Sequence, residues 1–207
     1  MTLWAVLPVK RLEKGKSRLR PCLGSEELFM LNWTQFLSTF EKLVNCPGID
    51  KVLVVSADEK ILNHVRENGQ IALPEHEKSS LNLAVSQALS FIKDSDGGQV
   101  LILPADLPWM TGKDLSGFIQ LKKDSNFIAI VPDQKQTGTN AVLISNPGLL
   151  KPKFGENSFQ KHTKQAQNIG TKLIVWLNKN IQRDLDTPQD FEFYIKIKPY
   201  PNKDKKE

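Results

Sequence analysis

Apolar runs of strand length alternate with helix-like segments along this chain, and the alternation limits the possible folds more than any other feature. Residues 52–55 read Val-Leu-Val-Val, a run that suits a strand covered on both faces. Elsewhere, apolar residues recur at three- to five-residue spacings that suit one face of a helix. The pattern predicts a single α/β domain with a mixed, mainly parallel sheet flanked by helices. The expected strands are residues 3–8, 51–56, 71–73, 100–104, 127–132, 140–145 and 171–177.

Residues that commonly cap helices precede most of the expected helices. Thr111 and Asp114 have the spacing of a capping box. Thr187 is followed by a proline at the first helical position and by Asp190 three positions after the cap. The expected N-caps are Ser25, Asp58, Ser79 or Ser80, Thr111 and Thr187, and a further helix is expected at 159–168.

The length of 207 residues suits one domain, which we assign to residues 1–196, followed by a solvated basic tail at 197–207. No apolar stretch approaches the ~20 residues that span a bilayer, and we expect no secretory signal from the apolar, strand-like start of the sequence. We therefore expect a cytoplasmic protein without membrane contact. Residues 9–20 hold six Lys or Arg side chains and one Glu. Because the basicity is local, it does not require a nucleic-acid partner.

Two acidic clusters follow apolar runs. Asp106 comes after the run 100–104, with a proline on each side, and Asp184 and Asp186 come after the run 173–177. Ligands of open α/β sheets bind outside the carboxyl ends of the strands. Carboxylate oxygens in such places suit Mg²⁺, which is usually held by one or two carboxylates plus substrate phosphates. A lone aspartate here could equally serve a turn, but two clusters together favour a metal site.

The basic segment 9–20 lies in an unusually long connection after the first expected strand, where ~2–6 residues are usual. Its Lys and Arg charges could clamp a triphosphate, and a solvated run of charge is the alternative. The segment lacks the spacing of a Walker P-loop, and the chain lacks Gly-x-Gly-x-x-Gly, so a dinucleotide oxidoreductase is unsupported.

Two loops rich in small residues, 137–140 and 154–159, could bind an anion through backbone N–H groups, although each alone could be an ordinary turn. His162 lies one turn after Ser158 and could reach a ligand there. No nucleophile elbow is present. An ionised phosphate or carboxylate nucleophile needs no general base, so phosphoryl or nucleotidyl transfer fits this composition.

Five motifs, in order, also resemble those of a known family. They are Ala5-Val-Leu-Pro-Val-Lys10 with Lys16-Ser-Arg-Leu19, Pro104-Ala-Asp-Leu-Pro108, Gly138-Thr-Asn-Ala141, Phe154-Gly155 with Ser158, Phe159 and His162, and Asp184-Leu-Asp-Thr-Pro188. As a set they resemble the CofC family, the 2-phospho-L-lactate guanylyltransferases of coenzyme F420 biosynthesis. The resemblance covers nearly the whole chain. Where the family usually has Gly-Leu-Asn, this chain has Ser80-Leu81-Asn82.

The resemblance implies a Rossmann-like, glycosyltransferase-A-like nucleotidyltransferase. It would transfer GMP from GTP to the phosphate of a three-carbon phosphoacid, such as 2-phospho-L-lactate or phosphoenolpyruvate, and release pyrophosphate. Magnesium would be held by Asp106, Asp184 and Asp186. The triphosphate would be held by Lys10, Lys16 and Arg18, with Lys16 also catalytic. Asn82 would face the base, and the phosphoacid would be held by Thr139, Gly155 and Ser158.

Two other functions stay open at this point. One is a nucleotidyltransferase that uses CTP or a sugar phosphate, and the other is a non-catalytic nucleotide-binding regulatory module on the same fold. The carboxylates of Asp106, Asp184 and Asp186 argue against the non-catalytic module, which would have no need for all three. The sequence does not separate 2-phospho-L-lactate from phosphoenolpyruvate or a phosphoglycerate. It also leaves the oligomeric state open, a homodimer included.

Overall fold

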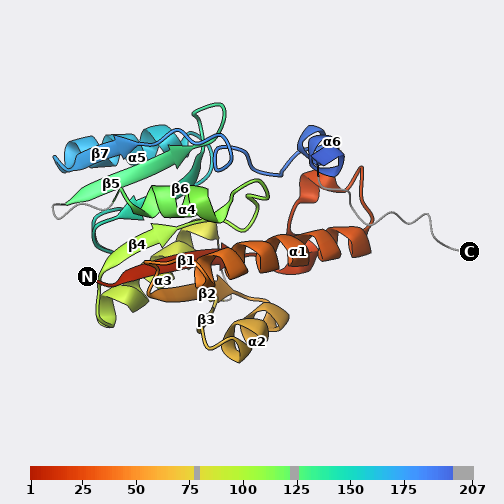
Figure 1. The fold of residues 1–207 in the computed structure, drawn as a ribbon, viewed down its shortest axis with the longest axis horizontal. Helices are drawn as coiled ribbons and strands as arrows, with labels where there is room; N and C mark the ends of the chain where they lie inside the picture. Colours follow the sequence, from red (N-terminus) through yellow and green to blue (C-terminus); the bar gives the residue numbers. More distant parts are fainter. Residues whose placement is uncertain (77–79, 122–125, 198–207) are drawn as a thin grey trace, which may run out of the picture.

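Seven strands form one sheet in the computed structural model, which describes residues 1–76, 80–121 and 126–197 (Figure 1). Their order across the sheet is β3-β2-β1-β4-β6-β5-β7. The sheet is mainly parallel, as the alternation of strands and helices predicts. The strands are β1 (Leu3–Val9), β2 (Lys51–Ser56), β3 (Ile71–Pro74), β4 (Gln99–Ile102), β5 (Phe127–Pro132), β6 (Thr139–Ile144) and β7 (Lys172–Val175).

One strand runs against the others. β6 is antiparallel to both of its neighbours, β4 and β5, whereas the remaining pairs are parallel. The sheet is therefore mixed and mainly parallel, as the sequence predicts. Because β6 runs in the opposite direction, its first residue, Thr139, lies at the edge of the sheet where the parallel strands end.

Helices cover both faces of the sheet (Figure 1). Apolar residues of α1, α2 and α4 pack on one face, and those of α3 and α5 pack on the other. The helices are α1 (Ser25–Val44), α2 (Glu59–Glu67), α3 (Leu81–Asp94), α4 (Gly112–Ile119), α5 (Ser158–Asn168) and α6 (Pro188–Ile197), with two 3₁₀ turns, η1 (Leu12–Lys14) and η2 (Ser17–Leu19).

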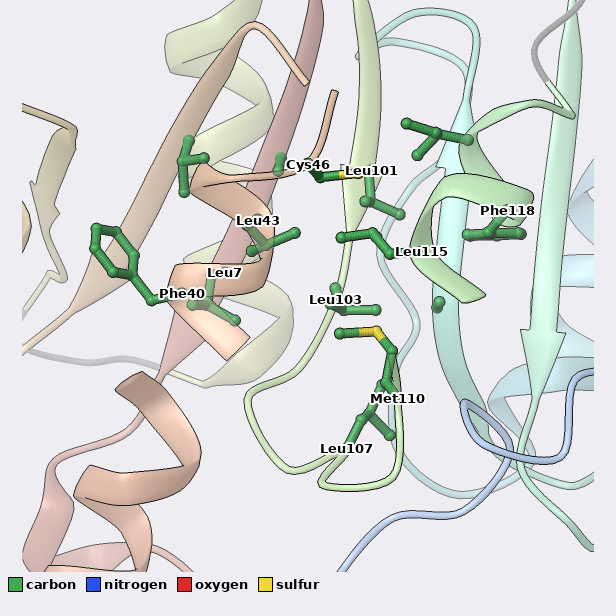
Figure 2. Packing of buried hydrophobic residues seen from close by; sticks show 14 of the residues in the cluster. Leu7, Phe40, Leu43, Cys46, Leu101, Leu103, Leu107, Met110, Leu115 and Phe118 are labelled. Atoms are coloured by element: carbon green, nitrogen blue, oxygen red, sulfur yellow. The ribbon is translucent and has the colours of Figure 1, made fainter. Parts of the chain in front are cut away.

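The core on the first face joins helices to β4 and to the residue that follows it, just before Asp106. Figure 2 shows Leu43 of α1 and Leu115 of α4 in the same cluster as Leu101 and Leu103. All four side chains are fully buried. Burial of apolar side chains contributes roughly 1.5–3 kcal/mol each, so this packing fixes the β4 segment firmly.

Most of the expected helix caps are confirmed. Asp58 and Ser80 accept backbone N–H groups at the starts of α2 and α3, and Thr111 forms its capping box with Asp114. Ser79, the alternative cap, lies outside the described residues. Ser80, at the position where the family that the motifs resemble usually has glycine, thus stabilises the start of α3 with its hydroxyl.

The cap expected at Ser25 is wrong by one residue. Gly24 is the N-cap of α1, because the Glu27 carboxylate accepts the Gly24 N–H at 2.8 Å. Ser25 is then the first helical residue. Glu27 stands three positions after Gly24, which is the capping-box spacing, so the acid rather than the serine decides where α1 begins.

The C-terminal helix packs against segments near the start of the chain. Phe191 and Tyr194 of α6 share a cluster with Leu19 of η2 and with Leu28 and Leu31 of α1. Figure 1 shows α6 beside the first turns of α1. The expected tail boundary at 196–197 falls at the last turn of α6, and the remainder of that tail lies outside the described residues. Among the residues described, no helix has the length and apolar character needed to cross a membrane.

Candidate active site

Asp106 lies in a loop after β4 that buried residues hold in place. Leu107 and Met110 are almost fully buried, and Thr39 of α1 donates a hydrogen bond to the Ala105 carbonyl at 3.1 Å. The Asp106 side chain keeps 35% exposure. The loop is therefore rigid, while its carboxylate faces solvent at the carboxyl-end edge of the sheet.

The second acidic cluster lies against this loop. The Leu185 N–H donates to the Asp106 carbonyl at 3.0 Å, and the Leu185 side chain is fully buried. Asp184 and Asp186 flank Leu185, so one backbone hydrogen bond brings all three acidic residues to the same place. The two acidic segments that the sequence singled out therefore lie against each other, although they are far apart in the chain.

The basic segment is anchored by its leucines, while its Lys and Arg side chains other than Lys16 are exposed. Leu12 and Leu19 are buried, and the Leu12 N–H donates to the Asp58 carboxylate at 3.0 Å. Gly15 has a steric reason to be glycine, since an added Cβ would lie 2.6 Å from the Asn32 amide nitrogen. The chain therefore passes close to α1 at Gly15, immediately before Lys16.

Lys16 contacts both acidic segments. Its ammonium donates to the Leu185 carbonyl and lies 3.7 Å from the Asp106 carboxylate, and its side chain is only 6% exposed. Arg18 pairs with Asp186 at 2.7 Å from a far more exposed position. Lys16 is thus the buried cation of the site, and Arg18 is a cation at its rim.

Asp184 has an unusual proton affinity. Burial raises the pKa of its carboxyl from 3.8 to about 6, and the nearby charges of Asp106, Asp186 and Asp190 act in the same direction. Ionisation of Asp184 therefore costs free energy in the protein alone. A bound cation would remove that cost.

The described residues contain no preformed set of three or more His, Cys, Asp or Glu side chains arranged around one metal position. Mg²⁺ does not need such a set, since one or two carboxylates complete its shell together with phosphates and water. Asp106 and Asp184 supply two close carboxylates, while Arg18 holds Asp186. The assignment of all three to one magnesium ion stays a prediction.

Two cavities adjoin at this edge of the sheet. The larger, about 530 Å³, lies at the ends of β1, β2 and β3 and the start of α3. The smaller, about 210 Å³, contains Lys16, Asp106 and Asp186. The shared lining residues are Pro8, Val9, Lys10 and Leu81. A long ligand could therefore extend from one cavity into the other past the end of β1.

Gln35 is a lining residue that the sequence did not reveal. It belongs to the smaller cavity and is 3% exposed. Its Oε1 atom has no hydrogen-bond partner among the described residues. Gln35 occupies a core-facing position of α1, and no motif distinguishes it from a residue that only packs.

The loop around Gly155 is tied to the start of α3. Asn82 donates from its amide nitrogen to the Phe154 carbonyl at 3.1 Å and accepts the Phe154 N–H at 2.7 Å. Both ends of the Asn82 amide are thus engaged with backbone, and its expected contact with the base stays a prediction. Leu81, the preceding residue, borders both cavities.

Thr139, Gly155 and Ser158 lie on connected segments. The Phe159 N–H donates to the Thr137 carbonyl at 3.1 Å, which joins the start of α5 to the loop before β6. Gly155 has φ of +108°, and an added Cβ would meet no atom within 4 Å. Its loop therefore offers open space beside exposed backbone, as a small anion would require.

His162 does not face a ligand directly. It is fully buried, and its two ring nitrogens contact the Thr139 hydroxyl and the Lys153 N–H, each at 3.1 Å. Burial lowers the pKa of His162 to about 4, and the positive charges of Lys153 and Lys161 act in the same direction. The expectation that His162 could reach a ligand directly is not supported, because the ring is fully buried and contacts Thr139 instead.

Comparison with known proteins identifies the family. The family model described as "Guanylyl transferase CofC like" matches residues 3–197. A phosphoenolpyruvate guanylyltransferase of Sphaerobacter thermophilus is 33% identical over 93% of this chain and 92% of its own. A 2-phospho-L-lactate guanylyltransferase of Methanobrevibacter smithii is 29% identical over 91% of this chain and 81% of its own.

The solved structures support the fold. A protein from Desulfovibrio desulfuricans G20, described as a nucleotide-diphospho-sugar transferase, superposes with a TM-score of 0.76 over 97% of this chain and 90% of its own. Its sequence identity is 15%. At that identity the similarity establishes the fold, which is the glycosyltransferase-A-like Rossmann type that the motifs imply.

Proposed function

Since this chain belongs to the CofC-like guanylyl transferase family, we propose that it transfers GMP from GTP to the phosphate of a three-carbon phosphoacid and releases pyrophosphate. The observation that carries the proposal is the hydrogen bond from Leu185 to Asp106. It gathers the acidic residues around the buried ammonium of Lys16, beside two adjoining cavities. Cations and carboxylates in one cleft are what a metal-bound triphosphate requires.

The two cavities suggest how the nucleotide lies. The larger cavity has room for a base and ribose between the ends of the strands and α3. The smaller cavity contains Lys16 and the carboxylates, so it suits the phosphates. Lys10 lines both cavities and would meet the chain of phosphates between them. Arg18, an exposed cation at the rim of the site, would pair with the outer phosphates.

Asp106 and Asp184 fit a divalent cation, and Asp186 would join them once Arg18 turns toward a phosphate. The fit follows from the raised pKa of Asp184, because burial, and after it the charges of Asp106, Asp186 and Asp190, make ionisation of this carboxyl unfavourable until a cation lies beside it. When bound, magnesium would neutralise charge on the phosphates during transfer.

The chemistry needs no general base on the protein. An ionised phosphate oxygen of the acceptor attacks the α-phosphorus, a new P–O–P bond forms, and the bond to the β-phosphate breaks with loss of pyrophosphate. Lys16 would stabilise the charge that moves onto the leaving group. Preorganised charge of this kind is a major source of catalysis in such transfers.

Thr139, Gly155 and Ser158 would hold the acceptor. The Asn82 contact joins the loop that contains Gly155 to the start of α3, where the neighbouring Leu81 lines both cavities. Relatives of this chain are named for phosphoenolpyruvate and for 2-phospho-L-lactate. Both compounds carry a phosphate and a carboxylate on three carbons, so either would suit donors that backbone and hydroxyl groups provide.

Pyrophosphate release tests the proposal. Purified protein with Mg²⁺ would be given GTP or CTP, each with phosphoenolpyruvate, 2-phospho-L-lactate or 3-phosphoglycerate. We expect release with GTP and one of the first two acids. Release with CTP only would indicate a cytidylyltransferase. Tight GTP binding without release for any acid would indicate a nucleotide-binding module and would refute the proposed reaction.

A further inference from the structure

His162 is a buried polar residue that the proposed transfer does not use directly. It lies on α5, is completely inaccessible to solvent, and packs edge-on against Phe154 at 5.0 Å between ring centroids. Buried polar groups are normally retained only where their hydrogen bonds are satisfied. Both of its ring nitrogens do have partners, and these partners define which nitrogen carries the proton.

The Lys153 contact determines the tautomer. A backbone N–H can only donate, so Nε2 of His162 must accept from Lys153 with its lone pair. A neutral imidazole has one acceptor nitrogen and one donor nitrogen. The hydrogen therefore resides on Nδ1, and Nδ1 donates it to the Thr139 hydroxyl oxygen at 3.1 Å. The low pKa of His162 keeps the ring neutral in this arrangement.

The Thr139 hydroxyl is left with its own hydrogen to donate. Its oxygen accepts from His162, and within the described part of the chain no other hydrogen bond is found for this hydroxyl. Thr139 begins β6 at the sheet edge where the parallel strands end, and it is partly exposed. An oriented O–H donor at that edge suits an anion.

We infer that His162 is a positioning residue that turns the Thr139 hydroxyl into a hydrogen-bond donor for the anionic acceptor substrate. The inference rests on the proposed placement of the phosphoacid at Thr139. Lys153 supplies the backbone N–H that selects the tautomer, so Lys153 takes part in substrate recognition without touching the substrate.

Two substitutions at His162 separate positioning from packing. His162→Asn keeps an amide nitrogen near the place of Nδ1, so it can still donate to Thr139. His162→Gln keeps an amide oxygen near the place of Nε2, so it can accept from Lys153 but loses the bond to Thr139. We expect His162→Gln to raise the phosphoacid KM roughly tenfold, the scale of one hydrogen bond to a charged group, with the GTP KM unchanged. His162→Asn should stay within about threefold of the parent, well below that effect.

Equal phosphoacid KM values for the two variants would overturn the inference, and so would a larger rise in His162→Asn, which a packing role predicts because asparagine leaves more space at this buried position. Thr139→Val serves as the reference for the site itself. If Thr139→Val raises the phosphoacid KM and His162→Gln does not, the positioning role fails and the acceptor site stands. If Thr139→Val leaves that KM unchanged, the acceptor site at Thr139 fails, and the inference fails with it, while GTP-dependent pyrophosphate release would still support the overall reaction.

The tautomer can be measured even if a variant does not fold. Imidazole ¹⁵N chemical shifts of the full-length parent at neutral pH should show a protonated Nδ1 and an unprotonated Nε2 for His162. The chain has three histidines, and the signals lost in His162→Gln, or else long-range couplings in the parent, assign the ring. A proton on Nε2 would overturn the inference.

Discussion

Replacing Asp184 with asparagine should make the protein more stable and inactive at once. The pKa of Asp184 is about 6 in the folded chain and 3.8 ordinarily, chiefly because the side chain is buried. At pH 7.5 the folded protein therefore carries a carboxylate whose ionisation is disfavoured. Asp184→Asn keeps the size of the side chain and removes that charge.

The stability gained in Asp184→Asn follows from the folded and ordinary pKa values of Asp184. The difference between 3.8 and about 6 corresponds to ~3 kcal/mol at ~1.4 kcal/mol per pKa unit. Asp184 is partly exposed, so solvent screening reduces the figure to about 1–2 kcal/mol. For a chain of this length, that gain raises Tm by roughly 2–8 °C.

The contribution of the Asp184 carboxyl to the free energy of unfolding depends on pH. Because the folded state binds the Asp184 proton more tightly than the unfolded state, stability from this group is complete below pH 3.8 and is lost as pH rises to about 6. The advantage of Asp184→Asn should therefore be full at pH 7.5 and nearly absent at pH 4. Thermal unfolding of metal-free protein at both values, with pyrophosphate release measured at pH 7.5, checks this.

Asp96→Asn is a matched control. Asp96 is an exposed carboxylate whose pKa is lowered, mainly by its hydrogen bond from Lys51. Its removal should not stabilise the protein at pH 7.5. A less stable Asp184→Asn protein at pH 7.5, or a gain that persists at pH 4, would refute the electrostatic reasoning. Unchanged activity in Asp184→Asn would refute the metal-binding role.

Three further predictions concern the substrate contacts. Lys16→Ala should weaken GTP binding by roughly 1.5–3 kcal/mol, the value of a hydrogen bond to a charged group, whereas the exposed Lys113→Ala should not; equal affinities in calorimetry would contradict the triphosphate role. Gly155→Val should raise the phosphoacid KM more than the GTP KM, because its side chain would fill the open space at φ +108°, and Ser158→Ala should act in the same direction more mildly; if only the GTP KM changed, the pocket would belong to the nucleotide. Asn82→Ala removes both bonds to the Phe154 backbone and should raise the phosphoacid KM about tenfold or more, at ~1.4 kcal/mol per tenfold change, and a change confined to the GTP KM would instead favour the predicted contact with the base.

The sequence alone determined the class of fold and most element boundaries. Strands such as 51–56 are apolar because both faces are covered, and caps such as Asp58 and Thr111 mark helix starts through local hydrogen bonds. These are properties of neighbouring residues. They can be read without knowing the rest of the chain, and the structure confirms them.

The sequence indicated which types of residue the candidate site would need. It singled out individual residues only where they belong to a recognisable motif. Asp106, Asp184 and Asp186 stood out because each follows an apolar run. Gln35 did not, since its burial in the smaller cavity depends on which side of α1 meets the loop after β4. That side is set by packing and not by any local signal.

Only the tertiary structure decided how the site groups interact. The Leu185–Asp106 hydrogen bond joins positions 79 residues apart, and the reversed direction of β6 brings Thr139 to the shared edge. His162 had appeared as a candidate ligand contact and instead lies buried behind Thr139. Contacts between distant segments form where apolar faces pack and backbone groups find partners, and the amino-acid order fixes them only through the complete fold.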